Sequence, residues 1–546
     1  MGELRGSPGP EGIGPSAPPS SALSHVLRPA TGLRLAVVGG IAFVYFLSYP
    51  LALGGADESH LLFEARRVFE GQVPYKDFFE SLTPLSFYLF AGVYWIAGTF
   101  LLPARVTIAV IEAVGCALLF HLVRRLASGL EAALAALILA GLCVPVWPFA
   151  SPHWISTTLG LAVATVVLSR RWQGSERVRP LAAGLLAGAS FCTQQQRGVF
   201  LVLWLPAAFS ILVASRPRGT RWRALITQTV WAACGTASVV LVVLGYAVSK
   251  ASLATFIDMA FGFAVNHYGP TQSGIWGWAA VVPIAKSFAA PTWLWLLRVS
   301  PMFPLAEGAF LLRRPRRNWQ RHDLESACLC VLAVLMAGSV WYLPDFIHVA
   351  FVLPFLIIPG VTVLYRLRSA LWWTRVPRGR QAVTVAVVLF ALAVAAQSIA
   401  NVPAAYRAAP VSLETDFGTI RVDSHMEQLF RAVRAHLVAE PSGRPQIYSF
   451  PNDAWLYLTL PADNVTPYSL LAARMFPPED FASVVDVLRT GRAGTVVLIT
   501  PLASGRVGGG ILGAVEQGYD LVDEVKPYRI YVRHHADRPS AADGAQ

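Results

Sequence analysis

The segment that decides the fold is GGADESHLLFEARRVFEGQVPYKDFFESLTP, residues 54–84. It follows the first apolar run, residues 35–53, which is long enough to span a bilayer and is interpreted as an uncleaved signal anchor. Asp57 and Glu58 come directly after this run, so we expect both carboxylates at the boundary between lipid and water. Partial desolvation there would raise the pKa of a carboxylate and make it a better base. Both acids would equally suit the N-terminus of the amphipathic helix predicted over 61–69, where they would complement its dipole.

The composition of the whole chain indicates a membrane protein. Of its 546 residues, 55% are hydrophobic and 14% are charged, compared with roughly 45–50% and 25% in soluble domains. The net charge is +12, but the arginines gather in short clusters between apolar runs. A nucleic-acid-binding protein would instead need a continuous basic surface. We therefore expect a lipid bilayer as a partner and no nucleic acid.

Twelve apolar runs have about the length of a membrane span. They are residues 35–53, 85–102, 106–123, 132–149, 155–169, 180–193, 198–214, 225–248, 292–312, 326–343, 347–365 and 381–400. Arginine clusters between such runs should be cytoplasmic. The clusters are at residues 124–125, 170–179, 216–223, 313–321 and 366–380. If all twelve runs crossed from a cytoplasmic N-terminus, every cluster would lie outside, so we expect 85–102 to be an interfacial or re-entrant helix.

This topology of about eleven spans gathers the polar segments on the outer face. These segments are residues 54–84, 144–154, 193–197, 250–291, 344–345 and everything after 401. We expect the fold to be mainly α, a polytopic helical membrane domain with juxtamembrane helices and a small C-terminal α/β extracytoplasmic domain. The predicted parts are a disordered cytoplasmic tail at 1–33, the membrane domain at 34–402, the α/β domain at 403–535 and a disordered tail at 536–546.

Secondary structure in the C-terminal domain is predicted from alternating patterns and turn residues. Short strands are expected at 446–450, 495–499, 521–525 and 529–532, and helices at 478–490 and 510–517. This alternation fits a small α/β domain. The side chains of Asp453, Trp455 and Tyr457 either contact an acceptor sugar or, as the default for such aromatic residues, belong to the core.

Asp57-Glu58 after the first span, the amphipathic helix, and then Tyr75-Lys76-Asp77-Phe78-Phe79 and Thr83-Pro84 form a pattern that resembles the C-type (GT-C) membrane glycosyltransferase superfamily. The resemblance is to bacterial relatives of dolichyl-phosphate-mannose protein mannosyltransferases and lipid A aminoarabinose transferases. Two prolines usually precede the second helix in that pattern, and Thr83-Pro84 departs from it.

The resemblance implies a multi-pass protein of the inner (plasma) membrane that transfers a sugar from a polyprenyl-phosphate donor, with inversion, to an extracytoplasmic glycan, lipid or protein. It also implies that Asp57 is the catalytic residue. Chemically, such a transfer needs a base for the acceptor hydroxyl, a cation for the departing phosphate and a groove open to lipid. We assign the base to Asp57, with Glu58 or Asp77 orienting the substrate, because inversion needs only one base.

Arg197 is the leading candidate for the phosphate-binding cation. It follows three glutamines, including Gln195, where the chain turns between two spans. A guanidinium can donate to two phosphate oxygens, although an arginine there could also simply snorkel to the interface. Lys76, Lys250 and Lys286 are weaker alternatives. The glutamines would either bind sugar hydroxyls or cap helices.

Histidine-bearing segments offer further candidates. Asp345 and His348 are predicted one helical turn apart on the same face, as a functional site or as a structural pair. Similar Asp-x-x-His patterns recur in relatives of the superfamily, which favours function. His153 is interpreted as part of an interfacial loop anchor. His267 lies in a loop that would be either a lid over the acceptor or, more simply, a polar connection.

No cofactor is predicted, since Cys and His do not cluster at ligand spacing and a Gly-rich nucleotide loop is missing. A divalent metal is left open. One alternative function is a transporter or flippase for a lipid-linked saccharide, which would place charges near the midplane. Here the acids concentrate at the outer edge and only Glu112 lies deep in a span. A non-catalytic cell-envelope assembly protein is the other alternative.

Overall fold

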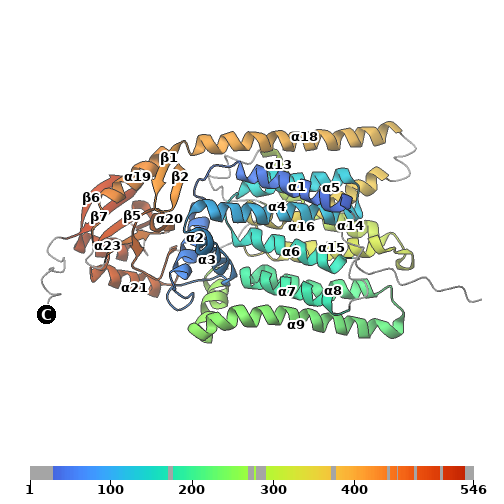
Figure 1. Ribbon diagram of the computed structural model, residues 1–546, viewed down its shortest axis with the longest axis horizontal. Helices are drawn as coiled ribbons and strands as arrows, with labels where there is room; N and C mark the ends of the chain where they lie inside the picture. The colour runs from blue at the N-terminus through green and yellow to red at the C-terminus, as the bar shows by residue number, and fades with distance from the viewer. Residues whose placement is uncertain are drawn as a thin grey trace, which may run out of the picture.

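The computed structural model describes residues 29–169, 176–268, 276–277, 291–369, 377–439, 443–451, 453–472, 476–503 and 508–534. Most of the predicted N-terminal tail, the predicted C-terminal tail at 536–546 and Lys286 lie outside these residues. The described chain is mainly helical, with long helices lying side by side and a smaller mixed-sheet region at one end of the bundle (Figure 1).

The long helices of the bundle match the predicted apolar runs. They are α1 (Pro29–Leu47), α4 (Leu101–Leu126), α5 (Gly129–Ile138), α6 (Pro152–Leu168), α7 (Val178–Thr193), α8 (Gln195–Val213), α9 (Arg218–Lys250), α13 (Pro291–Val299), α14 (Met302–Leu312), α15 (Arg321–Gly338), α16 (Phe346–Ser369) and α18 (Pro377–Ala408). Helix α5 continues through a π turn (Leu139–Cys143) and a 3-10 turn (Val144–Val146). The fold is therefore that of a multi-pass helical membrane protein.

Six helical stretches are long and apolar enough to cross a membrane. They are Leu101–Leu126, Gly129–Val146, Gln195–Val213, Arg218–Lys250, Phe346–Ser369 and Gln381–Ala408. Shorter apolar helices accompany them at Thr31–Leu47, Leu85–Ala97, Pro152–Leu168, Val178–Thr193 and Met302–Leu312. The predicted total of about eleven spans stays a prediction, because only the six meet this criterion within the described residues.

The run at 85–102 forms α3 (Leu85–Ala97), which ends before the predicted boundary. Thirteen residues extend about 20 Å, which is less than the roughly 30 Å of a hydrocarbon core. Gly98, with φ of 82°, breaks the chain before α4 begins. Helix α3 packs on α2 (Gly55–Phe69) between the bundle and the sheet region (Figure 1). This agrees with the expected interfacial or re-entrant helix.

The run at 292–312, one of the twelve candidate spans, is not a single helix. The structure has α13 up to Val299 and α14 from Met302, with a break at Ser300 and Pro301. Proline lacks a backbone donor and disfavours helical geometry in the residue before it. Pro301 therefore ends α13. Hydropathy alone does not indicate this break, because proline acts through the backbone.

The C-terminal region contains a five-stranded mixed sheet in the order β4-β3-β5-β7-β6 and a two-stranded sheet of β1 and β2. Their bounds are β1 (Val411–Thr415), β2 (Gly418–Val422), β3 (Gln446–Phe450), β4 (Asp463–Asn464), β5 (Thr495–Ile499), β6 (Tyr519–Val525) and β7 (Tyr528–Arg533). Helices α19 (Ser424–Ala435), α20 (Ala454–Thr459), α21 (Pro478–Arg489), α22 (Thr500–Ala503) and α23 (Gly509–Gly518) accompany them. The four predicted strands and two predicted helices are confirmed, whereas β1, β2, β4, α19, α20 and α22 were missed.

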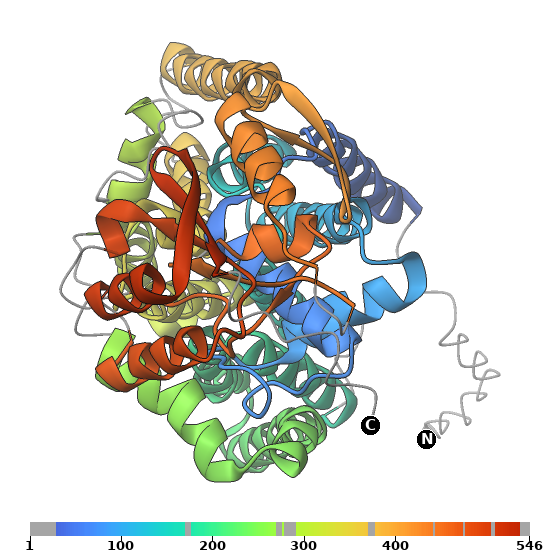
Figure 2. The same ribbon diagram turned by 90° about the vertical axis from the view of Figure 1, so that its left-hand side faces the viewer.

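The sheet region is attached to the end of the bundle through the chain and through backbone hydrogen bonds. Helix α18 runs past residue 402, the predicted boundary, to Ala408. Phe417 O accepts from Leu101 N at 3.1 Å, and Pro467 O accepts from Phe79 N at 3.1 Å. Figure 2 looks onto this end and shows the sheet region, in orange and red, in front of the helices.

The opposite end of the bundle holds the arginine clusters. Four carboxylates there are fully buried and each contacts an arginine. The pairs are Arg125 with Glu325, Arg366 with Glu307 and with Asp323, and Arg368 with Glu131. The polar segments that were predicted to share one face of the membrane meet at the other end of the bundle, beside the sheet region, as the contacts below show. Which end faces the cytoplasm stays a prediction.

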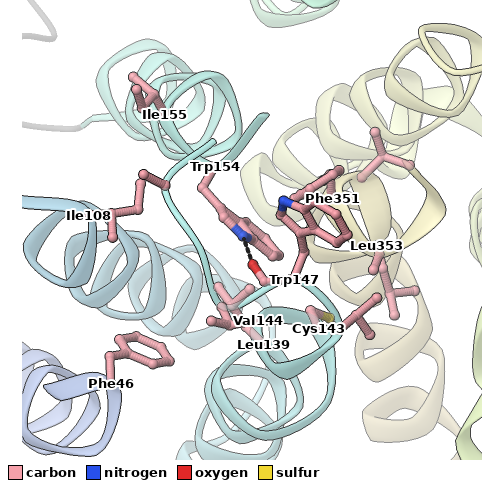
Figure 3. Packing of buried hydrophobic residues seen from close by; sticks show 14 of the residues in the cluster. Phe46, Ile108, Leu139, Cys143, Val144, Trp147, Trp154, Ile155, Phe351 and Leu353 are labelled. Atoms are coloured by element: carbon pink, nitrogen blue, oxygen red, sulfur yellow. Dashed lines mark hydrogen bonds between the residues drawn. The ribbon is translucent and has the colours of Figure 1, made fainter. Parts of the chain in front are cut away.

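A packed aromatic group stabilises the loop that leads into α6 (Figure 3). Trp154 donates a hydrogen bond from Nε1 to Trp147 O at 2.9 Å, and its ring meets Phe351 edge-on at 4.7 Å. These contacts hold residues 147–151 in place at the sheet end of the bundle. One backbone group of this loop, Ala150 N, takes part in the site described below.

Helices α7 and α9 approach closely through small residues. A Cβ added at Gly184 would lie 2.0 Å from Ala232 O on α9, and one added at Gly235 would lie 2.3 Å from Leu181 O on α7. Thr236 Oγ1 also donates to Gly184 O at 3.1 Å. Close approach of small residues is a common basis for helix association in membranes.

We expect Gly184→Val to lower the thermal stability of the detergent-solubilised protein, by roughly 1–3 kcal/mol or more, because the side chain must displace a backbone carbonyl. Gly245→Val is the matched control on α9, since a Cβ there meets nothing within 4 Å. Equal melting temperatures for the two variants would contradict this packing.

Candidate active site

Helix α2 begins tightly against the loop before α6. A Cβ at Gly54 would lie 2.0 Å from the ring of Phe149, so only glycine fits there. The next residue, Gly55, has a φ of 52°, which is also favourable for glycine. The glycine pair therefore fixes the start of α2, which carries Asp57 and Glu58 in its first turn.

Glu58 is fully buried, and its carboxylate is occupied by protein donors. Oε2 accepts from Arg105 Nη2 at 2.8 Å and from Gly54 N at 2.7 Å, while Oε1 accepts from Ala150 N at 2.9 Å. Arg105 also donates to the carbonyl of Pro148 at 2.7 Å. The expected role of the Glu58 carboxylate was to orient the substrate. In the structure this carboxylate faces the protein interior and anchors α2.

The side chain of Asp57, unlike that of Glu58, is exposed. The surrounding protein excludes enough water to raise the pKa of its carboxyl. His348 and His60 oppose this shift, and Asp345 adds to it. Asp57 thus has two histidines and a second acid as electrostatic neighbours.

Asp345 and His348 form a pair, as their spacing predicted. Asp345 Oδ1 accepts from His348 N at 2.8 Å and lies 2.8 Å from His348 Nδ1. Burial raises the pKa of the Tyr342 phenol to about 12, Arg197 opposes the shift, and Asp345 and Asp57 add to it. Tyr342 therefore lies among three of the predicted site residues, and these converge on one region.

Arg197 lies below this region and is 1% exposed. Its Nη1 donates to His153 O at 2.6 Å and to the hydroxyls of Ser156 and Thr157, each at 2.8 Å. The His153 ring stacks on Phe351 at 4.4 Å and meets His348 edge-on at 5.1 Å. Arg197 thus supports His153, whose ring contacts His348, and does not present its guanidinium to the surface.

Gln195 is also a structural contact. Its Nε2 donates to Ser81 O and to Ala260 O, both at 2.8 Å, and its Oε1 accepts from Thr83 N at 3.3 Å. The side chain is 3% exposed. Gln195 therefore ties the end of the loop between α2 and α3 to α8 and to the π turn Asp258–Gly262.

Asp77 and Lys76 make contacts within their own loop, and His267 lies near Asp480. Asp77 Oδ2 accepts from Val73 N at 2.7 Å and closes a turn, and the exposed Lys76 Nζ is 4.0 Å from Asp77 Oδ1. Burial raises the pKa of the Asp480 carboxyl on α21 and His267 opposes the shift, so His267 lies beside the sheet region.

A cavity of about 450 Å³ lies between the membrane helices and the sheet region. Its lining includes Gly55 and Ala56 from α2, Arg105 from α4, and Arg421, Asp423, Asp453, Trp455 and Tyr528 from the C-terminal region. Burial raises the pKa of the Asp453 carboxyl to about 6. Tyr457 instead belongs to the core, where its hydroxyl accepts from Ser449 N at 2.8 Å.

Within the described residues, no group of three His, Cys, Asp or Glu side chains is placed to hold a metal ion. The donor set around Asp57 therefore gives no basis for assigning a metal-dependent step.

The sequence interpretation missed the roles of Arg105, Gln194 and His60. All three have partners that are distant in sequence: Arg105 is 47 residues from Glu58, Gln194 is 38 residues from Ser156, and His60 is 409 residues from Ser469. Gln194 accepts from Ser156 Oγ at 2.9 Å and lies 2.8 Å from His153 Nδ1. His60 follows Asp57 by three residues, and this helical spacing was available as a signal.

Over most of its length, the chain is similar in fold to solved GT-C membrane glycosyltransferases. No protein-family model matches the sequence, and no curated protein matches it.

Among solved structures, the chain is similar to ArnT from Cupriavidus metallidurans bound to undecaprenyl phosphate. The TM-score is 0.58 at 14% identity, and the match covers 94% of this chain and 99% of ArnT. It is also similar to the oligosaccharyltransferase of Archaeoglobus fulgidus tethered to an acceptor peptide, with a TM-score of 0.55 at 12% identity over 94% of this chain and 75% of that one.

We expect Glu58→Gln to destabilise the protein by roughly 3–5 kcal/mol, because it leaves the buried Arg105 without a counter-charge. Glu516→Gln on α23 is the control, since Glu516 is exposed and surface substitutions usually change stability by less than about 0.5 kcal/mol. Thermal unfolding of both variants checks this, and a stable Glu58→Gln protein would refute the anchoring role.

Proposed function

We propose that this protein transfers a sugar from a polyprenyl-phosphate donor to an acceptor hydroxyl, with Asp57 as the general base. The observation that carries the proposal is the position of Asp57: it is exposed at the start of α2, directly beyond the first helix, with His348, Asp345 and His60 as neighbours. The fold shared with ArnT, whose structure holds undecaprenyl phosphate, supports the donor class.

In the proposed step, the acceptor oxygen forms a bond to the anomeric carbon while the bond from that carbon to the phosphate oxygen breaks. The acceptor proton passes to the Asp57 carboxylate, and polyprenyl phosphate leaves with the bonding electrons. Inversion follows because a single displacement occurs. The raised pKa of the Asp57 carboxyl makes it a stronger base than an ordinary aspartate.

His348 is the proposed cation for the departing phosphate. Asp345 accepts a hydrogen bond from its Nδ1, which leaves Nε2 to meet a substrate. The buried position of Arg197 favours a supporting role through His153, in place of the direct phosphate contact expected from the sequence.

The C-terminal region is the proposed acceptor-binding part. Its cavity combines an aromatic side chain, Trp455, with the charged groups of Arg421 and Asp423, a combination suited to binding a polyol such as a sugar. Gly55 and Ala56, the two residues before Asp57 in α2, form part of the lining of this cavity.

We expect Asp57→Asn to lower transfer by roughly 10²–10⁴-fold, because an amide cannot accept the proton. Transfer of label from radiolabelled polyprenyl-phosphate sugar in membranes, normalised to protein level, measures the effect. Asp520→Asn is the matched control, since Asp520 lies on β6 with 68% of its side chain exposed. Full activity of Asp57→Asn would refute the assignment of the base.

We expect kcat/KM to rise with pH through the pKa of Asp57, since only the ionised carboxylate is a base. The surrounding protein excludes enough water to raise this pKa, so the acid limb lies above about pH 4. Asp345 adds to the raised pKa of Asp57 and His348 opposes it, so Asp345→Asn should move the limb to lower pH and His348→Gln should move it to higher pH. Profiles that shift in the same direction would contradict this electrostatic arrangement.

A further inference from the structure

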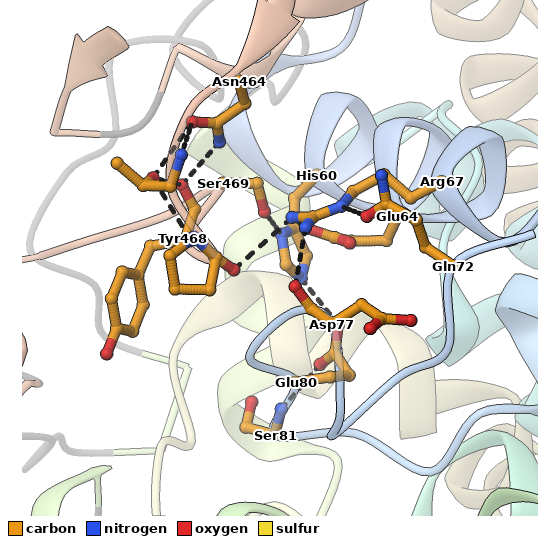
Figure 4. A network of polar contacts seen from close by, with 12 residues as sticks. His60, Glu64, Arg67, Gln72, Asp77, Glu80, Ser81, Asn464, Tyr468 and Ser469 are labelled. Atoms are coloured by element: carbon orange, nitrogen blue, oxygen red, sulfur yellow. Dashed lines mark hydrogen bonds and ion pairs between the residues drawn. The ribbon is translucent and has the colours of Figure 1, made fainter. Parts of the chain in front are cut away.

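One face of α2 carries more than the base. Asp57, His60 and Glu64 follow one another at spacings of three and four residues, which places them on the same side of a helix. This face meets the end of the loop between α2 and α3 and the segment around Ser469 from the C-terminal region (Figure 4). Three parts of the chain therefore converge beside Asp57.

The His60 ring contacts three side chains from different parts of the chain. Its Nδ1 lies 2.7 Å from Ser469 Oγ, its Nε2 lies 3.1 Å from Glu80 Oε2, and Phe87 of α3 meets the ring edge-on at 6.4 Å. With both nitrogens engaged, the ring has a defined orientation relative to α2.

Glu80 is itself fixed. It is 1% exposed, and its Oε1 accepts from Ser81 N at 2.7 Å and Leu82 N at 2.8 Å. Its second oxygen is thereby directed at His60 Nε2. The backbone donors thereby hold the Glu80 carboxylate in place beside the imidazole.

The charges around His60 favour the imidazolium form. Burial alone would lower the pKa of His60, but Glu80, followed by Glu64 and Asp57, raises it to about 9. Burial raises the pKa of the neighbouring Glu64 carboxyl to about 7, which Arg67, 3.8 Å away, and His60 oppose and Glu80 increases. His60 is therefore a cation at neutral pH.

We propose that His60, held by Glu80 and Ser469, is a positioning residue that keeps the Asp57 carboxylate ionised and ready to accept a proton. The inference rests on the proposed role of Asp57 as the base. It also gives the C-terminal region a direct part in the catalytic site, because Ser469 supplies one of the two polar contacts of the ring.

The effect on Asp57 follows from the charges that face it. The exclusion of water by the surrounding protein and the charge of Asp345 act to keep this carboxyl protonated, while His348 and His60 act to ionise it. Loss of the His60 cation should therefore raise the pKa of Asp57. Loss of the Glu80 charge should do the same indirectly, because His60 then loses its main counter-charge.

The first test compares the pH dependence of kcat/KM in the wild-type protein, His60→Gln and Glu80→Gln, with radiolabelled polyprenyl-phosphate sugar as the donor. We expect both variants to move the acid limb upward by roughly one pH unit, as for loss of a neighbouring charge. His436→Gln, a partly exposed histidine near Asp523, should leave the limb unchanged. A fall in kcat with an unmoved limb would show a merely structural role and overturn the inference.

The second test needs no activity. A histidine whose pKa is raised in the folded state contributes stability that is complete below about pH 6.5 and is lost as pH rises through about 9. The drop in melting temperature from pH 6 to pH 10 should therefore be smaller in His60→Gln than in the wild-type protein. Equal drops would overturn the inference, whereas full transfer by Asp57→Asn would refute the proposed function separately.

Discussion

The buried ion pair between Glu58 and Arg105 is the constraint on which the site depends. It joins the start of α2 to α4, and the two backbone donors that complete it come from Gly54 and from Ala150 in the loop before α6. Neither charge is stable at this depth without the other. Because Asp57 immediately precedes Glu58 in the chain, the burial of Glu58 fixes the position of Asp57 relative to the bundle.

Helix α2 is also held by contacts with the C-terminal region. Arg66 donates to Tyr457 O at 2.8 Å, and the His60 ring contacts Ser469. The helix that carries the proposed base is thus held between two parts of the chain that are distant in sequence. Removal of the sheet region would therefore alter the environment of Asp57.

Local patterns predicted the elements well, and long-range contacts decided the roles. The strands at β3 and β5 follow from runs of β-branched and aromatic residues, and the Asp345-His348 pair follows from helical spacing. The interior position of Glu58 depends on Arg105, and that of Arg197 depends on His153, both on other helices. Such contacts leave no local signal in the sequence.

The arginine end of the bundle has a further consequence for how the chain can change. Glu131, Glu307, Asp323 and Glu325 are all fully buried there, and their arginine partners lie mostly on other helices. An acid separated from its arginine would remain in a poorly hydrated environment at considerable cost. Helices α4, α5, α14, α15 and α16 can therefore be exchanged between related chains only as charge-matched sets.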